Sequence, residues 1–160
     1  MDKATLNFKL DFTPLDKLKF SLSKHFKKSL GKAALQFLTW CNQGSPKSPA
    51  KPPIRYGVLR GSSSAFVGKE LIGVFEQSIS SGATEKPTPA KSHNGKEMEF
   101  TVGWNTDYAN KMHEWTGDWG KFTEQDGDAG AKWIEKHLTA DRDAIVDMIA
   151  KQFGKDAGLS

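Results

Sequence analysis

The strongest constraint on the fold is a long amphipathic helix predicted near the N-terminus, from Pro14 to about Gly44. Thr13 offers an N-cap directly before Pro14, and proline suits the first helical position because its missing N–H group has no intrahelical partner there. Beyond this start, apolar residues recur at steps of three and four: Leu15, Leu18, Leu22, Phe26, Leu30, Ala33, Phe37 and Cys41. That spacing places them on one face of a helix about 45 Å long, and other elements must cover this face.

Two segments show the period-two alternation of a half-buried strand. In residues 5–12 the apolar members fall on one side: Leu6, Phe8, Leu10 and Phe12. In residues 97–104 the apolar side holds Met98, Phe100 and Val102. Because Glu97 and Glu99 alternate with these residues, they are expected on the solvent face, where nothing would shift the pKa of either carboxylate.

A hairpin and two loops are predicted between these segments. Residues 58–67 and 71–77 flank Gly68-Lys69, a pair that suits a tight turn with glycine leading. Residues 78–96 hold almost no apolar side chain, and a stretch of this length is typical of a functional or disordered loop. We predict that it is mobile until a neighbour orders it. A proline-rich, extended connector is predicted over residues 44–53.

Helical spacing returns in the last third of the chain. A short helix is predicted over residues 107–115, a loop rich in Gly and Asp over 116–130, and a longer helix from about 129 to 153. Thr139 could cap a fresh helix, so the long element is expected to be bent or split there. The elements predict one α+β domain over residues 1–160, in the order β-α-β-β-β-α-α, with helices packed on one face of a small, mostly antiparallel sheet.

Charge is divided unevenly along the chain. The net charge is +4, but residues 1–56 carry +8 and residues 57–160 carry −4. Such asymmetry indicates a partner, or self-association through opposed faces; a solvated lysine helix that keeps the protein soluble is the alternative. Lys24, Lys27 and Lys28 on the predicted helix are the basic candidates. Only three of the 23 basic residues are arginine, which disfavours sequence-specific recognition of DNA bases.

The sequence shows no residue set typical of an enzyme or a metal site. Its four histidines are far apart without zinc-ligand spacing, and no nucleotide-binding or nucleophile motif occurs. We therefore expect no catalysis, no cofactor and no metal. No apolar run approaches the roughly 18 residues of a membrane span, and the first residues lack the apolar region of a secretory leader. The single cysteine, Cys41, cannot form an internal disulfide, so synthesis in a reducing cytoplasm is expected.

Two motifs resemble a known family. Residues 55–62, Arg-Tyr-Gly-Val-Leu-Arg-Gly-Ser, are similar to the Gly-x-Leu-Arg-x-Ser segment of neck and tail-completion proteins of long-tailed bacteriophages. Residues 102–109, Val-Gly-Trp-Asn-Thr-Asp-Tyr-Ala, then Met112-His113-Glu114, are similar to that family's second signature, in which a strand runs into Tyr-Ala and ends on a glutamate. The chain departs from the family pattern at Trp115, where glycine is frequent, and at Tyr56, where threonine is usual.

The resemblance implies a structural virion protein at the head–tail junction. It implies a homo-oligomeric ring, with a hexamer expected, whose neighbours are the head-closure or stopper ring on one side and the tail terminator or tube on the other. Genomic DNA would pass through the lumen without sequence-specific contacts, and no membrane would be involved. The tail terminator itself is a close alternative. Two alternative hypotheses come from other functional classes: a nonspecific nucleic-acid-binding module, and a small hydrolase associated with lysis.

Structural and interface candidates come from the two motifs and from the basic helix. They are Gly57, Leu59, Arg60, Tyr108, Ala109, Glu114, Lys24, Lys27 and Lys28. Gly57 is expected to permit a tight turn into a strand. Arg60, expected on that strand, could pair with a carboxylate across the sheet or across a subunit boundary, and Glu114 is one candidate partner. Tyr108 and Trp104 are expected in the core rather than in a contact.

Overall fold

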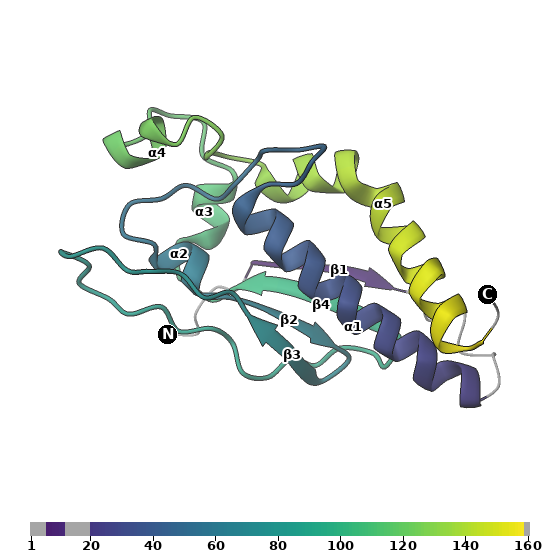
Figure 1. Cartoon of the computed structure of the whole chain (residues 1–160). Coiled ribbons are helices and arrows are strands. Elements are labelled where there is room, and N and C mark those ends of the chain that lie inside the picture. Colours follow the sequence, from purple (N-terminus) through teal and green to yellow (C-terminus); the bar gives the residue numbers. More distant parts are fainter. Residues whose placement is uncertain (1–5, 12–19, 159–160) are drawn as a thin grey trace.

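Four antiparallel strands form the centre of the fold (Figure 1). The computed structural model describes residues 6–11 and 20–158. Its strands are β1 (Leu6–Asp11), β2 (Ser63–Val67), β3 (Glu70–Val74) and β4 (Glu99–Trp104). They stand in the order β1-β4-β2-β3, and each neighbouring pair is antiparallel. The predicted α+β class with a small antiparallel sheet is therefore confirmed.

The hairpin is confirmed, but the strand that enters it is shorter than predicted. The β2–β3 turn contains Gly68, whose φ of 57° suits a residue without a side chain. Residues 58–61, expected to begin the strand, instead form the short helix α2 (Val58–Gly61). Two serine hydroxyls stabilise this helix by donating to its carbonyl groups: Ser62 to Leu59 at 2.7 Å and Ser63 to Arg60 at 2.7 Å.

The long N-terminal helix packs on one face of the sheet, as predicted. α1 (Phe20–Gln43) crosses the strands and α5 (Trp133–Asp156) lies beside it (Figure 1). The predicted beginning, Pro14 to Lys19, lies outside the described residues. The core between α1 and the sheet is apolar and fully buried, with the ring centroids of Phe37 and Phe100 6.2 Å apart. Burying such side chains stabilises the fold by about 1.5–3 kcal/mol each.

α5 is one continuous helix, so the predicted split near Thr139 was wrong, whereas the helix does change direction along its length, as the alternative of a bend predicted (Figure 1). The Thr139 hydroxyl donates to the Glu135 carbonyl at 3.0 Å, one turn earlier, and is therefore used inside the helix rather than as a cap. The short helix predicted near residue 110 is confirmed as α3 (Ala109–His113). The predicted loop over 116–130 contains a further helix, α4 (Lys121–Gln125).

The second face of the sheet is also covered, and this overturns the expected exposure of Glu99. Residues 78–96 contain no helix or strand, yet His93 lies against this face, with its ring 5.6 Å from that of Phe66 and its Nε2 3.2 Å from the Thr101 hydroxyl. Glu99 is only 2% exposed and lies 3.6 Å from the ammonium of Lys9. The alternation of residues 97–104 was predicted correctly, but alternation alone could not show that a loop covers the polar side of this strand. The mobility of this loop stays a prediction.

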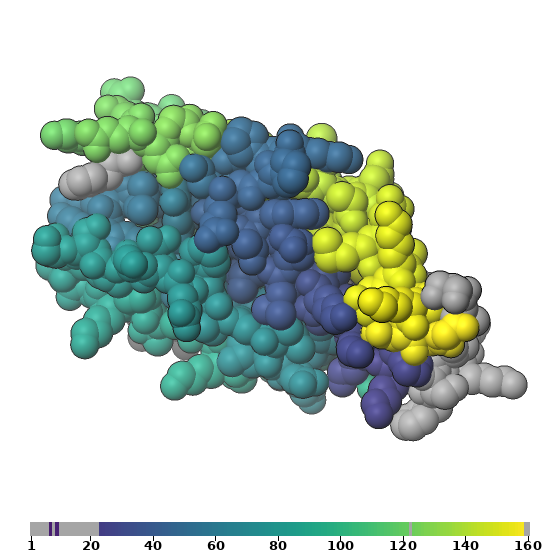
Figure 2. All heavy atoms as spheres, in the orientation of Figure 1, coloured from purple at the N-terminus to yellow at the C-terminus, as the bar shows by residue number. Residues whose placement is uncertain are grey.

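The molecule has two distinct ends (Figure 1). α2, α3 and α4 gather at the upper left, whereas the beginning of α1 and the end of α5 lie at the lower right. Figure 2 shows α1 (blue) in the middle of this face, between the teal hairpin and the yellow α5. No helix of the described part of the chain is long and apolar enough to cross a membrane.

Candidate functional site

The two motifs that resemble the phage family meet at one cleft of about 670 Å³. From the first motif Tyr56, Val58 and Leu59 line it, and from the second Tyr108 and Met112. Trp119 and Thr123, on either side of the start of α4, close a further wall, and Thr84 and Glu85 come from the long loop. The cleft therefore brings together parts of the chain that are far apart in sequence.

Gly57 starts α2 in a conformation that disfavours a side chain. Its φ is 86°, in the left-handed region, and an added Cβ would lie 2.7 Å from the carbonyl oxygen of Ser78. The predicted tight turn at Gly57 is confirmed, although it leads into a helix and not into a strand. This turn sets the direction of α2 and thereby one wall of the cleft.

Replacing Gly57 by alanine is expected to lower the free energy of unfolding by about 2–3 kcal/mol, because the left-handed backbone and the close carbonyl both oppose a methyl group. Chemical unfolding of both proteins measures the difference. Gly154→Ala is the control, since nothing lies within 4 Å of the added atom and the position is helical; it should stabilise by about 0.5–1 kcal/mol. Equal stability of Gly57→Ala and the wild type would show that the turn at Gly57 does not require glycine.

Arg60 is buried and holds two segments together, but its predicted partner was wrong. Its Nε and Nη2 donate to the carbonyl oxygen of Pro52 at 3.1 and 2.8 Å, and Nη2 also donates to Asp126 at 2.9 Å. Asp126 accepts a second contact from Lys51 at 2.6 Å. Arg60 lies on α2 rather than on a strand, and its carboxylate partner is Asp126, not Glu114. The planar guanidinium thus links the connector, α2 and the end of α4.

The two cations change the pKa of Asp126. Partial burial raises the pKa, but hydrogen bonds from Lys51 and Arg60, together with their charges, outweigh burial, so the pKa lies below its ordinary value of 3.8. Since the folded pKa is lowered, the carboxylate stabilises the fold above the ordinary pKa, and this contribution is lost as pH falls through the folded value.

Asp126→Asn is therefore expected to destabilise the protein by about 1–2 kcal/mol at neutral pH, after allowance for solvent screening, and by much less in acid. Unfolding free energies at about pH 7 and about pH 3 measure the change. The exposed neighbour Asp128→Asn is the control and should differ little from the wild type at either pH. A destabilisation by Asp126→Asn that is the same at both pH values would rule out the ion pair as its cause.

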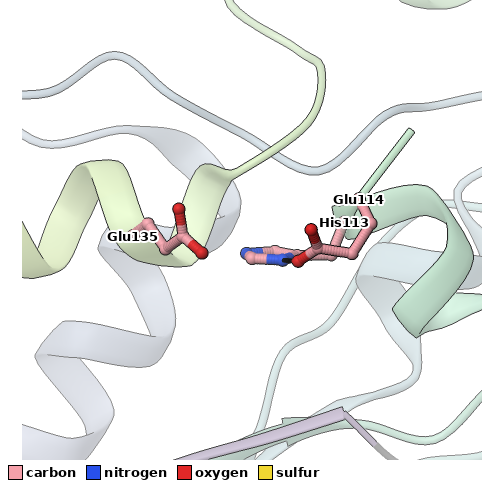
Figure 3. A group of neighbouring side chains, drawn as sticks. All are labelled: His113, Glu114 and Glu135. Carbon is pink, nitrogen blue, oxygen red and sulfur yellow. Dashed lines mark hydrogen bonds and ion pairs between the residues drawn. The ribbon is translucent and has the colours of Figure 1, made fainter. Parts of the chain in front are cut away.

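Glu114 joins α3 to the start of α5 (Figure 3). It accepts hydrogen bonds from the Lys132 ammonium and from Nδ1 of His113, the latter at 2.9 Å, and Lys132 also contacts Glu135 at 3.1 Å. The bonds from Lys132 and then His113 lower the pKa of Glu114. His113 is buried against Trp133, with ring centroids 4.7 Å apart. Glu114 is thus part of a local ionic network, exposed to solvent, rather than a partner of Arg60.

The same cluster is the one group among the described residues whose atoms could hold a metal ion. His113, Glu114 and Glu135 each offer one ligand atom, and these atoms lie within 4.8 Å of one another; Figure 3 shows the imidazole between the two carboxylates. Lys132 bridges both carboxylates and offsets part of their charge. No local pattern in the sequence marks this group, because Glu135 lies on a different helix. We assign it a structural role.

The remaining candidates of the two motifs are divided between core and cleft. Ala109 is fully buried and Leu59 nearly so. Tyr108 is half-buried and lines the cleft; burial, and then the charge of Glu85, raise the pKa of its hydroxyl. Trp104 is fully buried, as expected, with its ring centroid 5.7 Å from that of Trp133. Tyr108, expected in the core, therefore packs against the core with part of its side chain and lines the cleft with the rest.

The three lysine candidates lie at the other end of the molecule, away from α2 to α4 (Figure 1). Lys27 lies 3.9 Å from Glu70 and 4.0 Å from Glu97, and Lys28 lies 3.5 Å from Asp156. Lys24 is exposed, and no carboxylate of the described residues lies within 4.0 Å of it. Part of the excess positive charge is thus balanced within the chain.

Sequence analysis missed one buried polar group, formed by Ser45, His137 and Asp141. His137 and Asp141 are spaced by four on α5, with Nδ1 2.6 Å from the carboxylate, while Nε2 lies 2.7 Å from the carbonyl oxygen of Ala50. The Ser45 hydroxyl contacts both Asp141 oxygens at 2.7 and 2.8 Å. Since a carbonyl oxygen only accepts, Nε2 donates to it and cannot act as a base. The group anchors the connector to α5.

Comparisons with known proteins add no relative. No family model matches the chain, and no curated protein and no solved structure shows significant similarity to it. The resemblance to neck and tail-completion proteins therefore rests on the two motifs, their order and their spacing. What the structure adds is the position of those motifs in space.

Proposed function

We propose that this chain is a structural subunit of the head–tail connector of a tailed bacteriophage, a neck or tail-completion protein. In this role, copies form a ring between head closure and the tail, and DNA passes through the lumen. One observation carries the proposal: the two motifs with the resemblance lie side by side around a single cleft, so that they act as one surface. Their polar residues Arg60 and Glu114 make structural contacts, as an assembly protein requires.

The rival hydrolase has little support in the described residues. The arrangement that most resembles a catalytic triad is Ser45, Asp141 and His137, but its serine contacts the aspartate instead of the histidine. The histidine is fully buried and its second nitrogen is engaged with a backbone carbonyl. Cys41 is also fully buried, and burial, with the charge of Asp141, raises the pKa of its thiol well above the ordinary value. Neither His137 nor Cys41 can meet a substrate in this conformation.

A second candidate, nonspecific nucleic-acid binding, is favoured by the exposed lysines Lys24 and Lys32, which are about two turns apart on α1. Binding of this kind depends on neutralising several phosphates at once. Because Lys27 and Lys28 already face carboxylates of the same chain, fewer free charges remain than the sequence suggested. The structural role is therefore preferred.

Interrupting the gene in a phage that encodes this chain tests the proposal. DNA-filled heads and separate tails should accumulate, and adding the purified protein should restore joined, infectious particles. If joined virions form normally and only lysis is impaired, the hydrolase reading replaces the proposal. If packaging fails before heads are filled, a role in DNA handling replaces it.

A further inference from the structure

A hollow with an apolar floor and a basic rim lies at the basic end of the molecule. It has a volume of about 390 Å³, and its floor contains Leu35, Val67 and Ile72. Four lysines of α1 surround it, against one carboxylate, Glu70. Lys24 and Lys32 of this rim are exposed and have no carboxylate of the described chain within 4.0 Å. Leu35 is 39% exposed, so the hollow presents uncovered apolar surface beside two exposed lysines, of which Lys32 also acts on Asp156 through its charge.

A compact aromatic and acidic turn lies at the opposite end. We call residues 115–119 the knob. The ring centroids of Trp115 and Trp119 are 6.5 Å apart, and the Trp115 indole N–H donates to the Asp118 carbonyl at 3.2 Å. Both rings are partly exposed and Asp118 is exposed. The surrounding residues 107–128 hold six carboxylates and two lysines, and two of these carboxylates, Glu114 and Asp126, are paired with cations from other segments.

The two surfaces are complementary in chemistry, but they lie at opposite ends of the molecule, so one molecule cannot insert its own knob into its own hollow. The knob lies between α3 and α4, which are at the upper left of Figure 1, whereas the hollow is lined by residues 24–35 of α1 and by the β2–β3 hairpin. Figure 2 shows the green segment forming the upper left end of the molecule. Tryptophan is enriched at the centres of interfaces, and carboxylates beside it would meet the lysine rim. Only another molecule can supply this match.

We propose that a second copy of this chain inserts its knob into the hollow, with Asp118 and Glu124 facing Lys24 and Lys32. The contact is heterologous, since different surfaces of the two copies meet, and repetition closes a ring if the rotation between copies allows it. This inference deepens the proposed function and rests on its requirement for self-association. A duplex of nucleic acid is the less suitable occupant, because phosphate recognition needs the lysines but leaves the apolar floor uncovered.

A charge-swap experiment on the full chain tests the contact. Variant H carries Lys24→Glu and Lys32→Glu in the hollow, and variant K carries Asp118→Lys and Glu124→Lys near the knob. Sedimentation velocity should show self-association of the wild type that weakens with salt. H alone and K alone should each associate at least about tenfold more weakly. An equimolar mixture should recover, because the acidic knob of H fits the basic hollow of K and the basic knob of K fits the acidic hollow of H.

The controls and the opposing outcomes separate the alternatives. Lys47→Glu with Lys136→Glu changes two exposed lysines elsewhere and should associate as the wild type does; circular dichroism confirms that each variant folds. The proposal is overturned if the wild type is monomeric at all accessible concentrations, if the mixture fails to recover, or if H loses only duplex DNA binding. Normal restoration of phage joining by H and K would overturn this contact but leave the proposed function intact. If the mixture recovers association but the protein has no role in joining heads to tails, the proposed function is overturned and this contact stands.

Discussion

Replacing His137 by alanine is expected to lower the free energy of unfolding by about 3–5 kcal/mol, because two buried acceptors each lose a hydrogen-bond partner and a cavity opens in the core. Both ring nitrogens are engaged, Nδ1 with Asp141 at 2.6 Å and Nε2 with the Ala50 carbonyl at 2.7 Å. Without the ring, the buried carboxylate keeps only the Ser45 hydroxyl as a partner. A cavity would also open beside Phe37, whose ring centroid lies 6.4 Å from that of His137.

Denaturant unfolding with a matched control decides this prediction. Lys136 precedes His137 on α5 but is exposed, so Lys136→Ala should change stability by no more than about 0.5 kcal/mol. A His137→Ala protein within about 1 kcal/mol of the wild type would show that the connector is not held by this group.

Arg60→Lys is expected to cost about 2–3 kcal/mol although it preserves the charge. The guanidinium donates to the Pro52 carbonyl and to Asp126 in one plane, and its side chain is only 8% exposed. A lysine ammonium is a single point, so it cannot keep both contacts in this geometry, and one buried acceptor loses its donor.

Arg55→Lys is the matched control for Arg60→Lys. Arg55 belongs to the same motif but is exposed, with its guanidinium 5.0 Å from the Tyr56 ring centroid, and the change should cost about 0.5 kcal/mol or less. Equal effects of the two substitutions on the midpoint of thermal unfolding would remove the special role of Arg60.

Periodicity predicted the parts of the fold in which one face is buried. The three- and four-residue steps from Phe26 to Cys41 are enough to define α1, because each of these apolar positions faces the sheet or α5. The hairpin was predictable from Gly68, since few residues other than glycine tolerate its φ of 57°.

Contacts between distant segments were not predictable in this way. Asp126 follows Arg60 by 66 residues, and nothing local marks it as the partner. Glu99 alternates with apolar residues as an exposed side chain would, but the loop that holds His93 covers its face of the sheet. α2 replaced the expected strand because Gly57 begins a turn and two serine hydroxyls satisfy the carbonyls that follow.

The candidate site shows the same division between local and long-range information. The motifs around Leu59 and Tyr108 were visible in the sequence, whereas their meeting at one cleft depends on the order of strands in the sheet. The pair His137 and Asp141 did leave a local signal, because residues spaced by four share one face of a helix. Its burial, which gives the pair its importance, depends on the connector that crosses α5.

Cryo-electron microscopy of an intact virion that encodes this chain tests the central claim most directly. The proposed function predicts a ring of copies at the head–tail junction, coaxial with the portal, in which each density fits a four-stranded antiparallel sheet with α1 on one face and α5 beside α1. A junction built entirely from other chains, in virions whose mass spectrum lacks this protein, would contradict the account.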